Sequence, residues 1–320
     1  MTLREELGQL SWYAKQYRSP ARVRRQLRVN LDLTMPVLPR ARRQKGAVWG
    51  ISLVRDELDV LPHTVAHLFA QGVDQVLIAD NGSDDGTREF LTNAARRDPR
   101  IHVAFDAQPA HWQSEKVTRL AHAAGRAGAD WIVPFDADEF WFAPDMPLAD
   151  WLREQTASIV HAGFHHMAPV ATIEGALIDS DFFIDREPSF PGKVAVRAHP
   201  LLEIGPGNHR ASRVGGVTTG LQIAHAQYRT PEQVARKVRQ GAAAARMTGE
   251  DTRWFSPHWE KGAQLDDAAI ADVWAQLTSG QSDDRLGFEF RDPVRVARPL
   301  IWPSWDPSRQ LLSRQRGQHS

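Results

Sequence analysis

The stretch that most constrains the fold is the twelve-residue run WIVPFDADEFWF at positions 131–142. Its apolar first half leads directly into three acids, Asp136, Asp138 and Glu139, and aromatic residues close the run. A short apolar segment that stops at such a change in polarity is typical of a buried strand ending at an acidic edge. Carboxylates this close repel one another unless a cation lies between them. The run therefore predicts a strand end that carries a divalent-metal site.

Strand-like and helix-like segments alternate on the N-terminal side of this run. Short connections between such segments predict right-handed crossovers and a mostly parallel, Rossmann-like sheet flanked by helices. Ligands of these sheets bind at the carboxyl ends of the strands, so we expect Asp56, Asp80 and Asp136 to converge on one crevice. The expected strands are 47–54, 75–79 and 101–105, and the expected helices are 61–69, 87–97 and 114–128, with Ser114 as the cap of the last.

The pattern is less regular after Pro147. We expect strands at 158–167 and 221–225, extended chain over 182–204 and a short helix near 266–277. Thr230 followed by Pro231 predicts the start of a helix that runs to about Met247, because proline is favoured at the first helical position.

Composition narrows the function classes. The 320 residues include no cysteine, which excludes disulfides, thiolate metal sites and a cysteine nucleophile, and fits a cytoplasmic location. The N-terminus lacks an apolar segment of the signal-peptide kind, and no window resembles a transmembrane helix. The formal net charge is zero, so we expect no nucleic-acid partner for the molecule as a whole.

Residues 1–45 form a strongly basic arm, with eleven Lys and Arg against three acids. Prolines at positions 20, 36 and 39 are expected to interrupt helix in this arm. One interpretation is a solvated arm that packs on the main domain. The other is a peripheral contact with an anionic membrane or a polyanionic acceptor.

Two acidic segments are candidate ligand sites. In extended chain Asp136 and Asp138 point the same way, and two such carboxylates suit Mg²⁺ or Mn²⁺. The loop from Asp80 to Thr87 contains two glycines that permit tight turns, and Asp80 at the strand end is placed to hydrogen-bond a base or ribose. The alternatives are a solvated turn for the first segment and a turn capped by Ser83 and Thr87 for the second.

Histidines and a lysine supply further candidates. His209 follows a Gly/Pro loop and suits contact with phosphate or acceptor, while His225 at a strand end is either a metal ligand or a core histidine. Lys116 either neutralises a diphosphate or belongs to a solvated helix face. His63 and His67 have zinc-like spacing but lack the glutamate of HExxH, so we expect a surface helix.

Together these motifs resemble the family 2 type of GT-A glycosyltransferases. The resemblance rests on ISLVRDE (51–57), QGVDQVLIADNGSDDGT (71–87) and WIVPFDADEFW (131–141). The later pieces KVAVR (193–197), GNH (207–209) and HAQYRTPEQVARKVRQG (225–241) resemble a branch that includes the family 92 type, so the likeness covers roughly residues 47–247.

The resemblance implies a role for several residues. Asp80 would bind the nucleoside, with Asp56 and Glu57 near it. Asp136 and Asp138 would hold the metal and the donor diphosphate, and His225 would complete the metal site. The Glu-Asp pair and the Gln-x-x-Arg-Trp motif of many family 2 members are absent, so the base stays open among Glu139, Glu203 and His209.

The sequence thus predicts an α/β protein: a basic N-terminal arm (1–45), a GT-A glycosyltransferase domain (46–247) and a C-terminal helical extension (248–320). The expected function is metal-dependent, inverting transfer of a sugar from a nucleotide-sugar donor to a hydroxyl of a glycan, lipid-linked or small-molecule acceptor. The alternatives are a non-catalytic glycan- or polyanion-binding protein and a DxD-type phosphatase of the haloacid dehalogenase kind, although that type needs Thr or Val where Phe140 stands.

Overall fold

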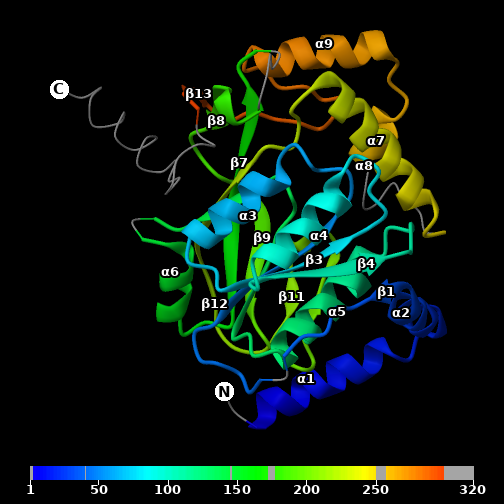
Figure 1. The fold of residues 1–320 in the computed structure, drawn as a ribbon, viewed down its shortest axis with the longest axis vertical. Helices are drawn as coiled ribbons and strands as arrows, with labels where there is room; N and C mark the ends of the chain where they lie inside the picture. The colour runs from blue at the N-terminus through cyan, green and yellow to red at the C-terminus, as the bar shows by residue number, and fades with distance from the viewer. Residues whose placement is uncertain (1–2, 40, 145, 172–176, 250–256, 299–320) are drawn as a thin grey trace.

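A mixed β-sheet forms the centre of the computed structural model, which describes residues 3–39, 41–144, 146–171, 177–249 and 257–298 (Figure 1). The main path of the sheet, in spatial order, is β1 (Leu33–Thr34), β4 (Ile101–Asp106), β3 (Gln75–Asp80), β2 (Val48–Val54), β5 (Trp131–Pro134), β9 (Ser189–Arg197), β7 (Ile159–Pro169), β12 (Val217–His225) and β6 (Glu139–Phe142). β8 (Phe182–Asp185) joins β7 and β13 (Pro293–Val296), and β10 (Glu203–Ile204) pairs separately with β11 (Ala211–Ser212).

The expected parallel sheet is present from β4 to β5. Strands β4, β3, β2 and β5 are parallel neighbours, and their registers place Val54 beside Asp80 and Asp80 beside Phe105. The carboxyl ends of these strands therefore meet at one edge. Beyond β5 the sheet is mixed, since β9 runs antiparallel to both β5 and β7, β12 runs parallel to β7, and β6 runs antiparallel to β12.

Helices cover both faces of the parallel part of the sheet, which explains why its strands read as nearly continuous apolar runs. α3 (Leu61–Ala70) and α4 (Thr87–Arg97) pack against one face, in a core that also buries Trp131, Phe135 and Phe140. α5 (Gln113–Arg126) packs on the other face with Ile51 and Leu77. These three aromatic residues of the run 131–142 are therefore core residues.

The predicted cap at Ser114 is wrong, and neither Ser83 nor Thr87 caps α4. α5 begins at Gln113, and the Ser114 hydroxyl instead donates to the carbonyl of Ile204 at 2.5 Å. Ser83 Oγ accepts a hydrogen bond from the backbone of Asp56, so it joins two loops and caps no helix. By contrast, Thr230 caps α7 (Pro231–Arg246) as expected, because its hydroxyl accepts from the N–H of Gln233 at 3.1 Å.

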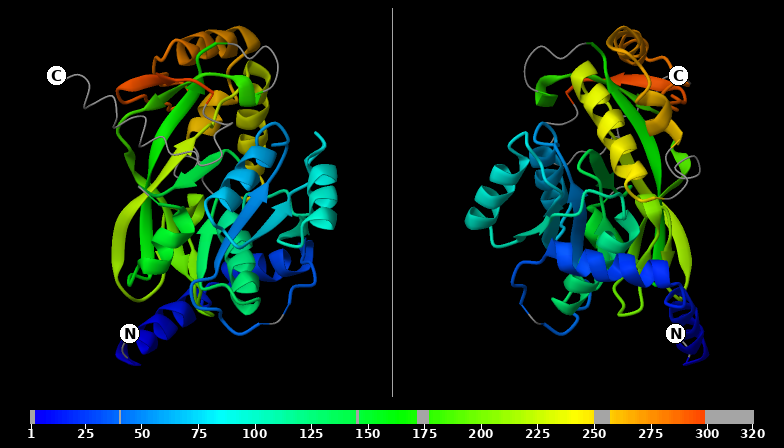
Figure 2. Two further views of the ribbon diagram at one scale, coloured as in Figure 1. Left: turned by 60° about the vertical axis from the view of Figure 1, so that its left-hand side comes forward. Right: turned by 90° about the vertical axis from the view of Figure 1, so that its right-hand side faces the viewer.

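The N-terminal arm is largely helical and packs on the sheet domain. α1 (Leu3–Gln16) is held by Gln9, whose amide donates to the carbonyls of Leu201 and Ser212. α2 (Pro20–Asp32) leads into β1, which pairs with β4. Pro20 was expected to interrupt a helix, but it starts one at the first position, where its missing N–H costs no hydrogen bond. In Figures 1 and 2, α1 lies at the end of the molecule opposite α9 (Asp267–Thr278).

The C-terminal part packs on α7. α8 (Pro257–Gly262), α9 and β13 follow it, and a separate apolar cluster joins Val234 and Val238 of α7 to Ile270 and Trp274 of α9. α6 (Leu148–Glu154) is a short helix that follows Pro147. Residues 299–320 of the predicted C-terminal extension lie outside the described residues. No described helix is long and apolar enough to span a bilayer.

Truncation of Phe135 will test how far the core supports the acidic strand end. Its ring is fully buried and lies against Gly50, where an added Cβ would come within 3.1 Å of it. We expect Phe135→Ala to lower the free energy of unfolding by about 3–5 kcal/mol in a urea titration. The matched control is Phe105→Ala at the end of β4, because that ring is 38% exposed and should cost less than about 1 kcal/mol. Equal losses in the two variants would contradict this assignment.

Candidate active site

A pocket of about 660 Å³ opens at the carboxyl ends of β2 and β5. Its walls come from the loop after β2, the turn between β5 and β6, the loop around residues 206–210 and one face of α7. The predicted site residues that line it are Asp56, Glu57, Asp136, Asp138, His209 and His225.

The loop after β2 is locked to the loop after β3. Asp56 has a φ of 54°, a left-handed conformation that aspartate adopts more readily than most residues. Its Oδ1 accepts from the N–H of Asp84 at 2.7 Å, and its Oδ2 accepts from the amide of Gln240 on α7 at 2.7 Å. These bonds hold Asp56 in the pocket wall without further support from a ligand.

Asp136 and Asp138 do not share one side of an extended chain, as the sequence led us to expect. They lie in the tight turn between β5 and β6, where the N–H of Glu139 donates to the carbonyl of Asp136 at 3.1 Å. Asp136 pairs with Lys193 of β9. Asp138 is buried and pairs with Lys237 of α7. Each carboxylate therefore has its own ammonium partner.

The pairing keeps Asp138 ionised although it is buried. Burial alone would raise the pKa of Asp138, but the charge of Lys237, with that of His225, outweighs it and holds the pKa well below its usual range. For Lys237, burial would lower the pKa, but Asp138 and Glu57 raise it above its ordinary value. Since Asp138 is 2% exposed and Lys237 is 22% exposed, this ion pair is screened less by salt than a pair on the surface.

Glu139 is placed behind the pocket, which contradicts its expected role as base. Its side chain is fully buried, and Oε2 accepts from the N–H of Asp136 at 3.0 Å and from the indole of Trp141 at 3.2 Å. Burial raises the pKa of Glu139, and the ammonium of Lys193 lies 2.8 Å from Oε1. These contacts make Glu139 a support for the turn, out of reach of an acceptor.

Two other predicted residues lie away from the pocket. Glu203 is on β10, where it forms an ion pair with Arg22 of the N-terminal arm at 2.6 Å, so it is misplaced as a base. Lys116 is 1% exposed and donates to the carbonyl of Ala110 at 2.9 Å, besides its ion pair with Asp106 at 2.7 Å. The structure therefore contradicts both roles: neither side chain can contact a donor or an acceptor.

Asp80 is also buried behind the surface of the pocket. Its Oδ1 accepts from the N–H of Ser83 at 3.2 Å, and its Oδ2 accepts from Arg88 at 2.7 Å, so it shapes the loop. The neighbouring Asn81 lines the pocket instead. Direct binding of a nucleoside by Asp80 does not agree with this geometry.

His209 is the base candidate that faces the pocket. Its Nδ1–H donates to the carbonyl of Gly192 at 2.8 Å, which leaves Nε2 as the nitrogen with the lone pair. Desolvation by the pocket walls lowers the pKa of His209. Gly207 has a φ of 66°, and a Cβ there would lie 2.4 Å from the histidine ring, so this position requires glycine.

Sequence reasoning missed the central cation of the site, Arg229. This fully buried guanidinium donates to Asp59 at 2.6 Å, to the carbonyl of Ala226 at 3.0 Å, and to Glu57. It lies 3.8 Å from Asp138. The only signal in the sequence was the acidic run 56–59, which has no cation near it except Arg55.

Three polar residues of α7, spaced as one face of a helix, were also missed: Gln233, Lys237 and Gln240.

The fit of a metal ion can be judged from the donors present. The described residues contain no group of three His, Asp or Glu side chains that would hold a metal alone. Asp138 and His225 do face each other, with Oδ1 and Nε2 3.5 Å apart, whereas Asp136 is turned toward Lys193 and Asn208. One carboxylate and one imidazole fit a cation whose remaining ligands are donor phosphates and water.

His67 is buried and bonded to the carbonyl of Trp141, so the expected surface position is wrong for it.

Replacement of Arg229 by lysine will test the central cation. Lysine keeps the charge but cannot form the forked contacts with Asp59. The carboxylates of Asp59 and Glu57 would therefore keep fewer hydrogen bonds around the buried side chain. We expect Arg229→Lys to lower the free energy of unfolding by about 2–4 kcal/mol, measured by chemical denaturation. The matched control is Arg239→Lys on α7, whose guanidinium contacts the exposed Asp267 and the carbonyl of Leu265 at the surface, and it should cost less than about 0.5 kcal/mol. A variant as stable as the control would rule out this role.

Comparisons with known proteins now add the family. Residues 51–167 match the family model described as "Glycosyl transferase family 2". A segment of 63 residues is 44% identical to the "Succinoglycan biosynthesis protein ExoA" of Rhizobium meliloti (strain 1021). This segment covers 20% of the chain and 18% of that relative, so the chain matches only a small part of its length.

Solved structures give weaker likenesses. One is S. aureus TarS 1–349, at 12% identity and a TM-score of 0.34, over 72% of this chain and 70% of that one. Another is the mannosyltransferase PcManGT from Pyrobaculum calidifontis in complex with GDP-Man and Mn²⁺. It is 15% identical, with a TM-score of 0.38, over 88% of this chain and 86% of that one. Scores this low carry no argument about the present chain.

The matches give no support to the family 92 features. They agree with the motifs and with the parallel sheet that carries them. Residues 51–167 of this chain match glycosyl transferase family 2, and they lie on an α/β fold of the GT-A type.

Proposed function

We propose that this chain is a glycosyltransferase that moves a sugar from a nucleoside-diphosphate sugar to an acceptor hydroxyl. The observation that carries the proposal is the pocket at the carboxyl ends of the family 2 strands, with paired carboxylates and ammonium groups in its floor. A site of this kind suits a reaction that expels a diphosphate, because fixed charges stabilise the charge that develops on the leaving group.

The donor side of the pocket contains both polar acceptors and cations. Asp56, Glu57 and Asn81 are placed to bind the nucleoside, and Lys193 and Lys237 lie where the diphosphate would sit. A divalent cation, Mn²⁺ or Mg²⁺, would be held by Asp138 and His225 and would supply further positive charge at the diphosphate. The protein groups alone are close to charge balance, so such a cation would help to hold an anionic donor.

His209 is the proposed base on the acceptor side. Its Nε2 takes the proton of the acceptor hydroxyl while the hydroxyl oxygen attacks the anomeric carbon. The bond from that carbon to the diphosphate oxygen breaks, and the nucleoside diphosphate leaves with the electron pair. A single displacement of this kind inverts the anomeric configuration, since the nucleophile enters opposite the leaving group. The acceptor is a hydroxyl of a glycan, of a lipid-linked sugar or of a small molecule.

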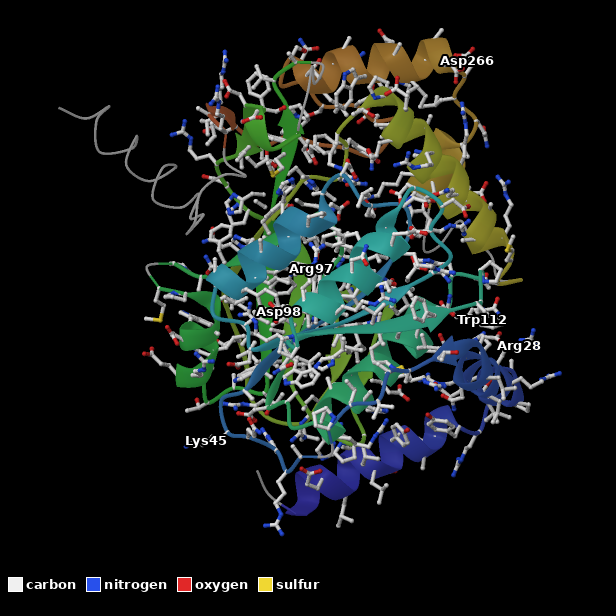
Figure 3. The ribbon with its side chains drawn as sticks, in the orientation of Figure 1. Arg28, Lys45, Arg97, Asp98, Trp112 and Asp266 are labelled. Carbon is white, nitrogen blue, oxygen red and sulfur yellow. The ribbon has the colours of Figure 1, made fainter. Side chains whose placement is uncertain are left out.

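Loss of the buried carboxylate will test the proposed donor site. We expect Asp138→Asn to reduce acceptor-dependent release of nucleoside diphosphate by about 10²–10³-fold, across a panel of UDP- and GDP-sugars with Mn²⁺. The matched control is Asp98→Asn, because Asp98 pairs with Arg100 at the amino end of β4, away from the pocket (Figure 3). Full activity in Asp138→Asn would refute the proposal. Release of phosphate from an aryl phosphate, without sugar transfer, would favour a phosphatase.

The pH dependence will test the base. Since desolvation lowers the pKa of His209, its imidazole stays neutral at neutral pH and becomes protonated only below pH 6.5. We expect kcat/KM to fall as the pH drops through this lowered pKa and to be flat between pH 7 and 8. His209→Gln should remove this acid limb and reduce the rate by about 10²–10⁴-fold. An unchanged limb in the variant would assign the proton transfer to another group. His122→Gln is the control, because that ring bonds the carbonyl of Leu202 outside the pocket.

A further inference from the structure

The proposed reaction leaves the basic N-terminal arm without a role. Within the described residues, ten large apolar side chains are exposed, and Leu7, Leu10, Leu27, Leu31 and Val37 of the arm are five of them. Scattered exposed leucines are ordinary, but half of the set in one short basic segment is not. The arm therefore presents a surface that its own domain does not cover.

The inner side of α2 is firmly attached to the domain. Val29 is fully buried, Arg25 pairs with Glu115 of α5 at 3.0 Å, and the guanidinium of Arg119 donates to the carbonyl of Val29 at 3.2 Å. Leu27 and Leu31 are not needed for this packing, since they are 58% and 78% exposed. The helix is fixed, and its leucines point outward.

The outer face of α2 consists of Arg24, Leu27, Arg28 and Leu31, which share one side of the helix by their spacing. Arg28 projects from the edge of the molecule in Figure 3. The one acid of α2, Asp32, is bound to Arg28 at 2.8 Å and to Gln108 at 3.0 Å. In the described part of the chain Arg24 has no ion pair, so this face is apolar with a net positive rim.

We propose that the outer face of α2 docks the chain on an anionic membrane surface. The two leucines insert at the boundary between headgroups and acyl chains, and the arginines contact lipid phosphates. A second copy of the chain fits less well, because a two-fold contact would bring arginines against arginines. Nucleic acid would use the arginines but leave the leucines in water.

Co-sedimentation with vesicles will test this docking on the full chain. We expect binding to vesicles of phosphatidylcholine with phosphatidylglycerol, and none to phosphatidylcholine alone. The double variant Leu27→Gln/Leu31→Gln should reduce the partition coefficient at least about tenfold. Arg24→Gln should weaken binding and reduce its dependence on salt.

Matched controls come from exposed residues on other elements. Val217→Gln at the start of β12 replaces a side chain that is 60% exposed, and Arg97→Gln replaces an arginine at the end of α4, labelled in Figure 3. Both should bind vesicles as the wild type does. Thermal melts will show that the variants are folded, and release of nucleoside diphosphate with a water-soluble acceptor should be unchanged in them, which separates this test from that of the proposed function.

Three outcomes would overturn the docking proposal. One is no binding to anionic vesicles. Another is unchanged vesicle binding by the leucine double variant, which would mean that the contact depends on charge alone. The third is a dimer in light scattering that the leucine variant dissociates, without vesicle binding, which would assign the face to self-association.

Discussion

The structure of the site depends on the neutralisation of carboxylates that approach one another at the edge of the sheet. Five acids from two segments meet there, the loop after β2 and the turn after β5, and each would repel its neighbours in a place that water reaches poorly. Arg229, Lys193 and Lys237 remove this conflict by direct ion pairs. Because these cations come from β9, the loop after β12 and α7, the same pairs join the two halves of the chain.

The fold brings these groups together for simple geometric reasons. Parallel strands end at one edge, so the loops after β2 and β3 and the turn after β5 are neighbours there. α7 then crosses this edge and contributes a polar face, while its other side packs against α9. The site is thus formed between a sheet edge and a helix, and its outer wall is the loop that contains His209.

Much of this could be predicted from local patterns. The parallel strands, the helices between them and the capped start of α7 follow from hydrophobic period and cap chemistry. The failures have a common cause. Glu139, Glu203 and Lys116 were chosen because they carry charge, but whether a charged side chain faces a pocket or a core depends on contacts with distant elements. Lys116 of α5 pairs with Asp106 of β4, and Glu203 pairs with Arg22 of the N-terminal arm.

The sequence alone shows that the run 131–142 begins as a buried strand and that this strand ends at acids, because an apolar run and its abrupt end are local properties. The order of strands and helices also placed Asp56 and Asp136 at one crevice, whereas Asp80, which was expected there too, is buried behind the pocket. Which cation meets which carboxylate depends on the three-dimensional fold. Lys237 lies 99 residues from Asp138, and Lys193 lies 57 from Asp136, and no pattern along the chain links positions so far apart.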